Sequence, residues 1–404
     1  MTKTIKPLLF TGAVIALSLC LPISQSAAQT LPPVETQTPT ADYKPAFPGQ
    51  TRAPGSQTKT KLQITVINHG LKSPFALRCL PDGRFIVTEK GGTMRILKAD
   101  GSYEKNIEGL PAVATGGQGG LLDVNFDSSF AQNRTLFWTY SEQAPDGFQL
   151  AVAKGVLSAD GSKLENVRVI YHAKPAYKGH LQFGSRIVFD KQGNLFVSTG
   201  EHSADEMRVK AQDPGTAIGK ILHITRDGKP VPGGPFAQKT DALPEVYAYG
   251  LRNPEGMAIN PATGEIWESE FGPRGGDEIN IIRPGKNYGW PVITYGIEYR
   301  GVKVGDGIQQ KEGMTQPIYY WNPSISPCGI TFYEGNLIPG WKGNLFVCCL
   351  SGQHIIRLII KDNKVVAEER LLQDKNERWR SLAAGKDGAL YGVTDNGNLY
   401  RIGK

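Results

Sequence analysis

A short phrase that recurs along the chain most constrains what this sequence can fold into. Each copy has a turn containing Gly, Asp or Asn, followed by a run of β-branched, aromatic and other apolar residues, which is the signal of a turn that leads into a strand. In three copies a second turn and a further strand follow, as in a hairpin. The copies read PDGRFIVTEKGGTMRIL from Pro81, DKQGNLFVSTGE from Asp190, NPATGEIWESEFG from Asn260, WKGNLFVCCLSGQHIIRL from Trp341 and KDGALYGVTDNGNLYRI from Lys386.

A unit of this kind cannot bury its apolar faces alone, so several copies must pack together. No long stretch has a convincing helical period, and the chain contains 48 Gly and 27 Pro. Radial packing of four-stranded sheets, an all-β β-propeller, fits best, and six blades suit the length. The phrases are unevenly spaced, which places long insertions between or within blades, and a pair of β-sandwiches is the weaker alternative. Loops of successive propeller blades meet at one end of the channel, so functional residues are expected far apart in sequence.

The N-terminus reads as an export signal. Positive residues precede an apolar run from Pro7 to Leu21, and Ser26 to Ala28 offer small residues for cleavage. This pattern predicts a signal peptide over residues 1–28 and a periplasmic or secreted protein, and the apolar run is short for a membrane span. Lipidation at Cys20 is disfavoured because Leu19 is large where a lipobox needs a small residue. An uncleaved anchor is disfavoured because the flanking residues suit cleavage.

The rest of the chain divides into a linker and one large domain. Residues 29–61 are rich in Pro, Thr, Gln and Ala without hydrophobic periodicity, which predicts a flexible linker. Residues 62–404 then form a single all-β domain, the propeller. Lys and Arg number 45 against 38 Asp and Glu, a formal net charge of +7, and these charges are scattered without a basic block. No nucleic-acid partner is therefore expected.

Four cysteines follow the predicted signal peptide, and their use is open. They are Cys79, Cys328, Cys348 and Cys349. Disulfides are possible in an oxidising compartment, but the sequence cannot supply their connectivity, and no Cys/His spacing indicates zinc. Buried small hydrophobes are the favoured interpretation. Cys348 and Cys349 are neighbours on a predicted strand, so their side chains should point to opposite faces.

Polar, Gly-rich segments at expected loop positions carry a resemblance to a known family. They are GGQGGLLDVNFD from Gly116, FGSRIVFDKQGNLFVSTGE from Phe183, AQDPGTAIGKILHI from Ala211, YAYGLRNPEGMAINPATGEIWESEFGPRGGDEINIIRPGKNYGWP from Tyr247 and NERWRSLAAGKDGALYGVTDNG from Asn376. Together they resemble the glucose/sorbosone dehydrogenase family, the soluble PQQ-dependent aldose sugar dehydrogenases. The match runs across essentially the whole propeller, and the string GLRNPEG…E-x-GP…DEIN…NYGWP is long and specific.

The resemblance implies a function as well as a fold. It implies six blades, the quinone cofactor PQQ near the top of the channel, and Ca²⁺ beside it. It also implies oxidation of an aldose sugar at the anomeric carbon to a lactone, by hydride transfer to the quinone. The sugar, the electron acceptor and the oligomeric state stay open.

Several residues are expected to contact the cofactor. Arg252 and Asn253 lie in a loop before a proline, and Arg offers a planar fork of donors to carboxylates such as the three of PQQ. Gln118 lies in a Gly-rich loop, and the resemblance places it near the reactive quinone carbonyl. Arg378 and Arg380 stand two apart, so both can face one side of an extended segment, and they match paired arginines that contact the cofactor carboxylates. Taken alone, these residues also fit ordinary turns and a solvated edge strand.

Backbone and carboxylate oxygens are the expected metal ligands. Gly272 and Pro273 form a sharp turn that can present carbonyls, and calcium takes oxygen ligands, main-chain ones included. By resemblance these two carbonyls hold the calcium that polarises PQQ. Asp277, Glu278 and the Tyr288 carbonyl could serve a further calcium, although a carboxylate pair on a turn is often only solvated.

The sequence departs from the family pattern where the reaction occurs. A base must remove the hydroxyl proton, and a His suits this task. The family usually has this His directly before Phe-Gly-x-Arg, where this chain has Gln182, which cannot act as a base. His180 could replace it if the loop bulges, and His202 is a weaker substitute. Arg252 is the third residue expected at the reacting edge, the side of the site where the sugar would meet the quinone. Some relatives have a Lys where this chain has Ser351, which can form a hydrogen bond but supplies no charge.

Three functions compete. A PQQ- and calcium-dependent dehydrogenase predicts that His180 points inward. A non-catalytic propeller that binds a sugar or another ligand predicts that His180 points away and that Gln182 fills the place of the base. A calcium-dependent hydrolase such as a lactonase needs an acidic metal cage, and the carboxylates do not obviously converge. No believable GxGxxG, phosphate loop or Ser-His-Asp order occurs, which disfavours NAD.

Overall fold

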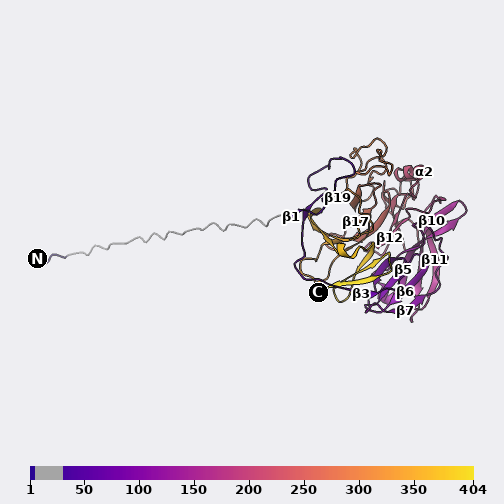
Figure 1. Cartoon of the computed structure of the whole chain (residues 1–404), viewed down its shortest axis with the longest axis horizontal. Helices are drawn as coiled ribbons and strands as arrows, with labels where there is room; N and C mark the ends of the chain where they lie inside the picture. Colours follow the sequence, from indigo (N-terminus) through magenta and orange to yellow (C-terminus); the bar gives the residue numbers. More distant parts are fainter. Residues whose placement is uncertain (5–30) are drawn as a thin grey trace.

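The computed structural model describes residues 1–4 and 31–404. Within these residues the strands form six sheets, and each sheet contains the four strands of one blade, which follow one another in the chain in every blade except the last. The first strands of neighbouring sheets contact one another in a closed ring, from β4 through β8, β12, β16, β20 and β24 back to β4. Figure 1 shows one of the blades as β5, β6 and β7, which follow one another toward the edge of the molecule. The structure thus confirms the predicted six-bladed β-propeller.

The elements have the following bounds. Blade 1 contains β4 (Pro74–Cys79), β5 (Phe85–Glu89), β6 (Thr93–Leu97) and β7 (Tyr103–Ile107). Blade 2 contains β8 (Leu121–Asn125), β9 (Thr135–Ala144), β10 (Gly147–Leu157) and β11 (Leu164–His172). Blade 3 contains β12 (Gly184–Phe189), β13 (Leu195–Thr199), β14 (Lys220–Ile224) and β15 (Val246–Tyr249). Blade 4 contains β16 (Pro254–Ile259), β17 (Ile266–Glu270), β18 (Asp277–Ile282) and β19 (Tyr319–Trp321).

Blade 5 contains β20 (Pro327–Phe332), β21 (Leu345–Cys349), β22 (Ile355–Lys361) and β23 (Lys364–Leu371). Blade 6 contains β24 (Trp379–Ala384), β25 (Leu390–Thr394), β26 (Leu399–Gly403) and β3 (Gln63–Asn68). The remaining elements are β1 (Leu31–Pro33), β2 (Pro54–Gly55), α1 (Phe130–Asn133), α2 (Asp205–Arg208) and the short 3₁₀ helices η1 (Val209–Gln212) and η2 (Gln373–Lys375).

Burial explains which strands are the most apolar. The second strands β5, β13 and β25 are buried along their whole length, because both faces of a blade pack against neighbouring blades. Strands covered on both faces are apolar throughout rather than alternating. The outer strands β7 and β11 are partly exposed and carry more polar residues. Strand β3 pairs with β26, so the N-terminal end of the propeller completes the last blade and closes the ring.

The segment predicted to be a flexible linker, residues 29–61, is instead packed on the propeller from Leu31 onward. Strand β2 pairs with β23 in parallel, and β1 pairs with β2, so this segment extends the sheet of blade 5 to six strands. Glu35 is buried and binds Arg370 Nη2 at 2.7 Å. Gln50 is buried and donates to the carbonyl of Pro317 at 2.8 Å. The composition was misleading because the partners of this segment lie in distant blades.

We name residues 31–61 the N-terminal strap. Thr40 lies in the strap, and its backbone N–H donates to Asn322 Oδ1 at 2.8 Å. Its hydroxyl lies 3.1 Å from the carbonyl oxygen of Arg274, to which it donates. Arg274 belongs to the turn between β17 and β18 that contains the predicted metal carbonyls. The strap therefore supports one side of the candidate site described below.

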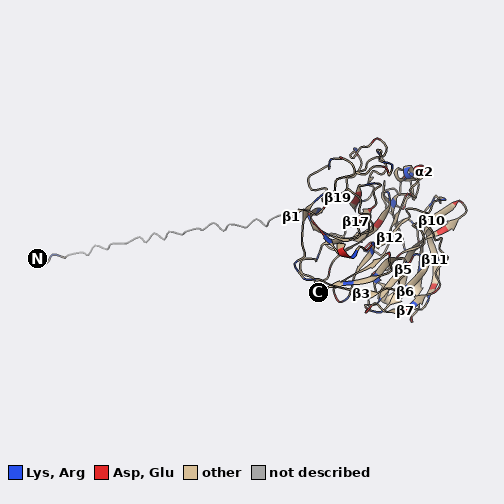
Figure 2. Cartoon of the chain, in the orientation of Figure 1, with Lys and Arg blue, Asp and Glu red and all other residues tan. Residues whose placement is uncertain are grey.

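Three further expectations concern cysteines, export and charge. All four cysteines in the described residues are free, and Cys348 and Cys349 lie in separate core clusters, as expected for opposite faces of one strand. The predicted signal peptide, residues 1–28, lies outside the described residues apart from 1–4. In the described part of the chain, no helix is long and apolar enough to cross a membrane. Figure 2 shows positive and negative residues interspersed over the propeller in this view.

Candidate functional site

The predicted site residues come together at one end of the channel. Gln118 precedes β8, Gln182 precedes β12, Arg252 and Asn253 precede β16, and Arg380 lies near the start of β24. These are the innermost strands of four blades and run in the same direction along the channel, so their preceding loops meet at a common mouth. This arrangement brings together residues more than 250 positions apart, as the propeller hypothesis requires.

Gln182 and Arg252 are in direct contact. Gln182 is buried, with 4% of its surface exposed. In the amide orientation that satisfies its neighbours, Nε2 donates to Glu201 Oε1 at 2.6 Å and Oε1 accepts from both terminal nitrogens of Arg252 at 3.0 Å. Arg252 Nη1 also donates to the carbonyls of Phe271 at 3.0 Å and Gly272 at 2.8 Å. The Arg252 fork therefore links the predicted base position to the predicted metal turn.

Backbone contacts hold Arg252 and its neighbour in place. The backbone N–H groups of Arg252 and Asn253 both donate to Glu270 Oε2, at 2.5 and 3.3 Å. Asn253 Oδ1 accepts from the Gly184 N–H at 3.0 Å, and Nδ2 donates to Glu255 Oε1 at 3.2 Å. Asn253 thus joins blades 3 and 4. Both the oxygen and the nitrogen of its side-chain amide are already hydrogen-bonded within the protein.

The predicted arginine pair is held by carboxylates. Arg380 donates to Glu255 Oε2 at 3.0 Å and to Asp395 at 2.9 and 3.2 Å. Burial disfavours its charge, but Glu255 and Asp395 outweigh this and raise the pKa of Arg380. Arg378 donates through Nε to Asp395 Oδ2 at 3.0 Å, and its side chain is 47% exposed. Arg380 is therefore a largely enclosed, permanently charged group, whereas Arg378 reaches solvent.

Lys90 adds a further cation that sequence analysis missed. It follows β5 of blade 1, and its Nζ donates to the Gly117 carbonyl at 2.9 Å. Burial lowers the pKa of Lys90, Arg380 lowers it further, and Glu255 and Asp395 oppose the change. These influences place Lys90 in the same cluster of charges as Arg380. Its position at the second turn of the first phrase was visible in the sequence, but nothing distinguished it from an ordinary turn lysine.

The two histidines considered as bases pack on aromatic side chains. The His180 ring lies 3.7 Å, between centroids, from Phe148, and a Cβ on Gly116 would lie 3.2 Å from its Nδ1. His202 is buried against Phe183 and Tyr177, and burial lowers the pKa of His202 to about 4. Gln182, by contrast, occupies the place beside Arg252. Gln182 thus lies where the family's histidine is expected, while the Nδ1 of His180 is buried without a hydrogen-bond partner among the described residues.

Two further predicted residues lie at the same mouth. Gln118 donates through its backbone N–H to the His180 carbonyl at 2.8 Å, and its Oε1 accepts from the Gln182 N–H at 2.7 Å. Gln118 therefore positions the loop that contains Gln182. Ser351 is exposed after β21, and its hydroxyl lies 2.8 Å from that of Ser326, which precedes β20.

Asp277 organises the turn that contains Gly272 and Pro273. Its two oxygens accept the backbone N–H groups of Gly272 at 2.8 Å and of Ile325 and Ser326 at 2.7 Å. Burial raises the pKa of Asp277 to about 6, although these three donors oppose the shift. A Cβ on Gly272 would lie 2.3 Å from the Gly275 carbonyl oxygen, so the turn requires glycine there.

A small cavity of about 10 Å³ lies beside this turn. Its lining includes Gly272, Glu270, Glu278 and Tyr288, three of which were predicted as metal ligands. The other two predicted ligands, Pro273 and Asp277, are buried in or beside the turn but do not line the cavity. A cavity of this size holds about one water-sized object.

Buried carboxylates surround this cavity. Glu268, Glu270 and Glu278 share the side-chain amide of Asn280, at 3.2, 3.5 and 3.4 Å. Burial and mutual repulsion raise the pKa of Glu268 and Glu278, and burial raises the pKa of Glu270 to about 7. Glu268 Oε1 and Asn280 Oδ1 are buried without a hydrogen-bond partner among the residues that the structure describes. In residues 1–4 and 31–404 the acidic side chains alone do not form a metal cage, so carbonyls would have to complete it. Unpartnered oxygens of this kind fit calcium.

Calcium is expected to raise the melting temperature more at pH 8 than at pH 5. Because the pKa of Glu270 is raised from 4.5 to about 7, the folded state holds a proton that the unfolded chain releases. Stability therefore falls as pH rises from about 4.5 through 7, and a divalent cation offsets the ionised carboxylates. Thermal unfolding with calcium or with chelator measures the rise in melting temperature that calcium causes. This rise should be smaller in Glu278→Gln but unchanged in the exposed control Glu312→Gln. Equal rises in both variants would contradict the prediction.

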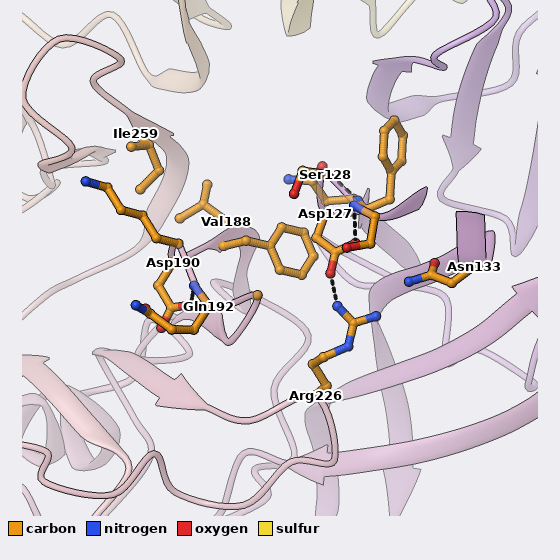
Figure 3. Close-up of a pocket in the computed structure, with 14 residues that line it drawn as sticks. Asp127, Ser128, Asn133, Val188, Asp190, Gln192, Arg226 and Ile259 are labelled. Atoms are coloured by element: carbon orange, nitrogen blue, oxygen red, sulfur yellow. Dashed lines mark hydrogen bonds and ion pairs between the residues drawn. The ribbon is translucent and has the colours of Figure 1, made fainter. Parts of the chain in front are cut away.

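Larger cavities lie elsewhere. One of about 700 Å³ is lined by residues that follow β8 and β12, at the opposite ends of the inner strands from the candidate site. Figure 3 shows this cavity, where Arg226 pairs with Asp127 and Asp190 lies across the space. Both of its carboxylates are already paired, because Asp190 binds His223 Nε2 at 2.9 Å. It contains none of the predicted site residues.

Comparisons with known proteins agree with this geometry. Residues 71–401 match the family model described as Glucose / Sorbosone dehydrogenase. The chain is 38% identical over 346 residues to the aldose sugar dehydrogenase YliI of Escherichia coli K12, covering 84% of this chain and 92% of that protein. A crystal structure of a glucose dehydrogenase is 40% identical with a TM-score of 0.81, covering 85% of this chain and 99% of that one.

The PQQ-bound aldose sugar dehydrogenase of Streptomyces coelicolor is 26% identical with a TM-score of 0.70, covering 86% of this chain and 99% of that one. These relatives are matched along nearly their whole length, and the family model spans the propeller from before β4 into β26. The chain belongs to the glucose/sorbosone dehydrogenase family.

Proposed function

We propose that this protein is a PQQ- and calcium-dependent dehydrogenase that oxidises an aldose sugar at its anomeric carbon to the lactone. The observation that carries the proposal is a set of cations at one channel mouth, contributed by three blades: Lys90, Arg252, Arg378 and Arg380. A tricarboxylate is the kind of ligand that such a set attracts. The aldose sugar and PQQ in the names of the relatives support the same substrate and cofactor.

Each residue has a distinct part in this proposal. Exposed Arg378 and half-buried Lys90 supply donors to cofactor carboxylates, while Arg380, fixed by Glu255 and Asp395, contributes a permanent positive charge. Gln118 and Ser351 offer hydrogen bonds at the rim. The bound quinone would supply the oxidising power by accepting hydride from the sugar.

The turn of Gly272 and Pro273, with Glu278 and the Tyr288 carbonyl nearby, would hold calcium beside this mouth. Arg252 contacts the Gly272 carbonyl and so connects the cation site with the reacting edge. The predicted export signal supports a further proposal, that the enzyme works in the periplasm or outside the cell.

A non-catalytic propeller remains the second candidate. Gln182 fills the base position beside Arg252, and the His180 ring packs on Phe148. Such a protein would bind PQQ, a sugar or another ligand without oxidising it.

A reconstitution assay separates these candidates. Purified protein receives PQQ and calcium, then a panel of aldoses with an artificial electron acceptor, and PQQ binding is followed by fluorescence quenching. Turnover that requires both additives is expected. PQQ binding without turnover on any aldose would favour the binding protein, and absence of PQQ binding would overturn the quinoprotein proposal.

A further inference from the structure

Glu201 occupies a position between the two residues expected at the reacting edge. It follows β13 and is 1% exposed. Its backbone N–H donates to the Arg252 carbonyl at 3.0 Å, and its Oε1 accepts from Gln182 Nε2 at 2.6 Å. Arg252 Nε lies 4.0 Å from the same carboxylate oxygen. Glu201 was not among the residues predicted from the sequence, because an acid after a strand has no distinguishing local pattern.

The second oxygen of Glu201 has no partner. Oε2 is buried and makes no hydrogen bond to any described residue. Buried carboxylate oxygens are nearly always satisfied, and the exceptions concentrate at functional sites. Since Gln182 holds Oε1, Oε2 is the oxygen left to accept a proton.

The charged neighbours leave this carboxylate poised near neutral pH. Burial raises the pKa of Glu201 to about 8. Arg252 and Arg208 act in the opposite direction, as does the backbone N–H of Ser203, while Asp205 reinforces the rise. The neighbouring His202 ring is buried, and its lowered pKa keeps it neutral at this pH. A general base works best when its pKa lies near the operating pH.

We infer that Glu201 is the proton acceptor of the proposed dehydrogenase reaction, in the place of the histidine that this chain lacks. The inference rests on the proposed function. The proton of the anomeric hydroxyl passes to Glu201 Oε2, which becomes a carboxylic acid, and the hydride on the same carbon passes to the quinone. The carbon–oxygen bond of the sugar thereby becomes the lactone carbonyl. Because Oε2 is buried, the hydroxyl would reach it after a side-chain movement at the mouth or through one bridging water.

Glu201→Gln tests this assignment, because the amide keeps the shape and removes the base. Turnover should fall by about 10²- to 10⁴-fold, the range typical of a lost general base, while PQQ affinity changes less than about threefold. Wild-type turnover should rise with pH through an apparent pKa near 8, because the carboxylate must be ionised to accept the proton. This limb of the profile should disappear in Glu201→Gln. The matched control is Glu206→Gln, since Glu206 is an exposed acid five residues away.

Two further measurements make the outcome unambiguous. Infrared difference spectra of the unreacted protein should show a carboxylic acid band that titrates near pH 8 in the wild type and is missing in Glu201→Gln. Gln182→His should partly restore turnover to Glu201→Gln, which a merely structural role for Glu201 would not allow.

An active wild type together with an equally active Glu201→Gln variant overturns the inference alone, as does a loss of turnover confined to His180→Ala. A wild type that binds PQQ but oxidises no aldose overturns both the inference and the proposed enzyme.

Discussion

A variant with Asp123 replaced by Ala is expected to lose about 3–5 kcal/mol of unfolding free energy, the usual cost of removing one partner from a buried ion pair. Asp123 is fully buried on β8 and binds Arg78 Nη2 at 3.0 and 3.1 Å and Arg186 Nη1 at 3.2 Å. It also accepts the Ile187 N–H at 2.9 Å. The substitution therefore leaves two guanidinium groups without their anion inside the channel.

The consequence extends beyond one blade. Arg186 Nε donates to the Glu255 carbonyl at 2.6 Å, and its Nη2 to the Arg380 carbonyl at 3.4 Å. The Asp123 carboxylate therefore neutralises two arginines whose contacts join blades 1, 2, 3, 4 and 6 around the axis. Chemical denaturation measures the loss, with Asp42→Ala as control, because Asp42 is exposed and its ion pair in the described part of the chain is with exposed Lys44. A loss below about 1 kcal/mol, the scale of a surface ion pair, would contradict the prediction.

Replacing Arg252 by Ala is expected to lower PQQ-dependent turnover on the order of 10²- to 10³-fold, the range seen when one positioned donor is removed from an active site. The guanidinium holds Gln182 together with the Phe271 and Gly272 carbonyls, and it lies 5.2 Å from the Trp290 ring centroid. Its loss leaves these buried acceptors unpaired and releases the turn at the proposed calcium site.

Arg252→Lys should restore little of this activity, because an ammonium group cannot reproduce a planar fork that reaches several oxygens. Steady-state kinetics of the reconstituted protein measure the effect, and the melting temperature of each variant shows that it is folded. Arg168→Ala is the matched control, since Arg168 is exposed on β11. Turnover of Arg252→Ala within about threefold of the wild type would remove Arg252 from the reacting edge.

The recurring phrases predicted strands well because their signals are local. KDGALYGVTDNGNLYRI became β25 and β26, and NPATGEIWESEFG supplied β17. The same local logic failed for the N-terminal strap, where Pro and Thr suggested a flexible linker. Glu35 and Gln50 are ordered by Arg370 and by the backbone near Pro317, hundreds of residues away. Composition cannot report partners at that separation.

The candidate site also divides into features that local sequence predicted and features that depend on distant partners. The sequence pointed to Gln118, Arg252, Asn253 and Arg380, and the structure places them at one mouth of the channel. It also suggested His180 as a substitute base, which depended on a bulge that would turn the ring inward. The His180 ring packs on Phe148 of the β9–β10 hairpin, a contact that the sequence could not indicate because it joins two separate segments.

By itself the sequence determined the blade units, the family and the loops that contain the candidate site. Turn residues, the alternation of apolar and polar residues and long motifs are all local signals that neighbouring residues supply. Only the tertiary structure decided which charged groups act together. Glu201, Glu255 and Asp395 look like ordinary acids in the sequence and acquire their roles from partners in other loops and blades. Burial and pairing set the protonation of a group, and both depend on what the closed ring of blades brings against it.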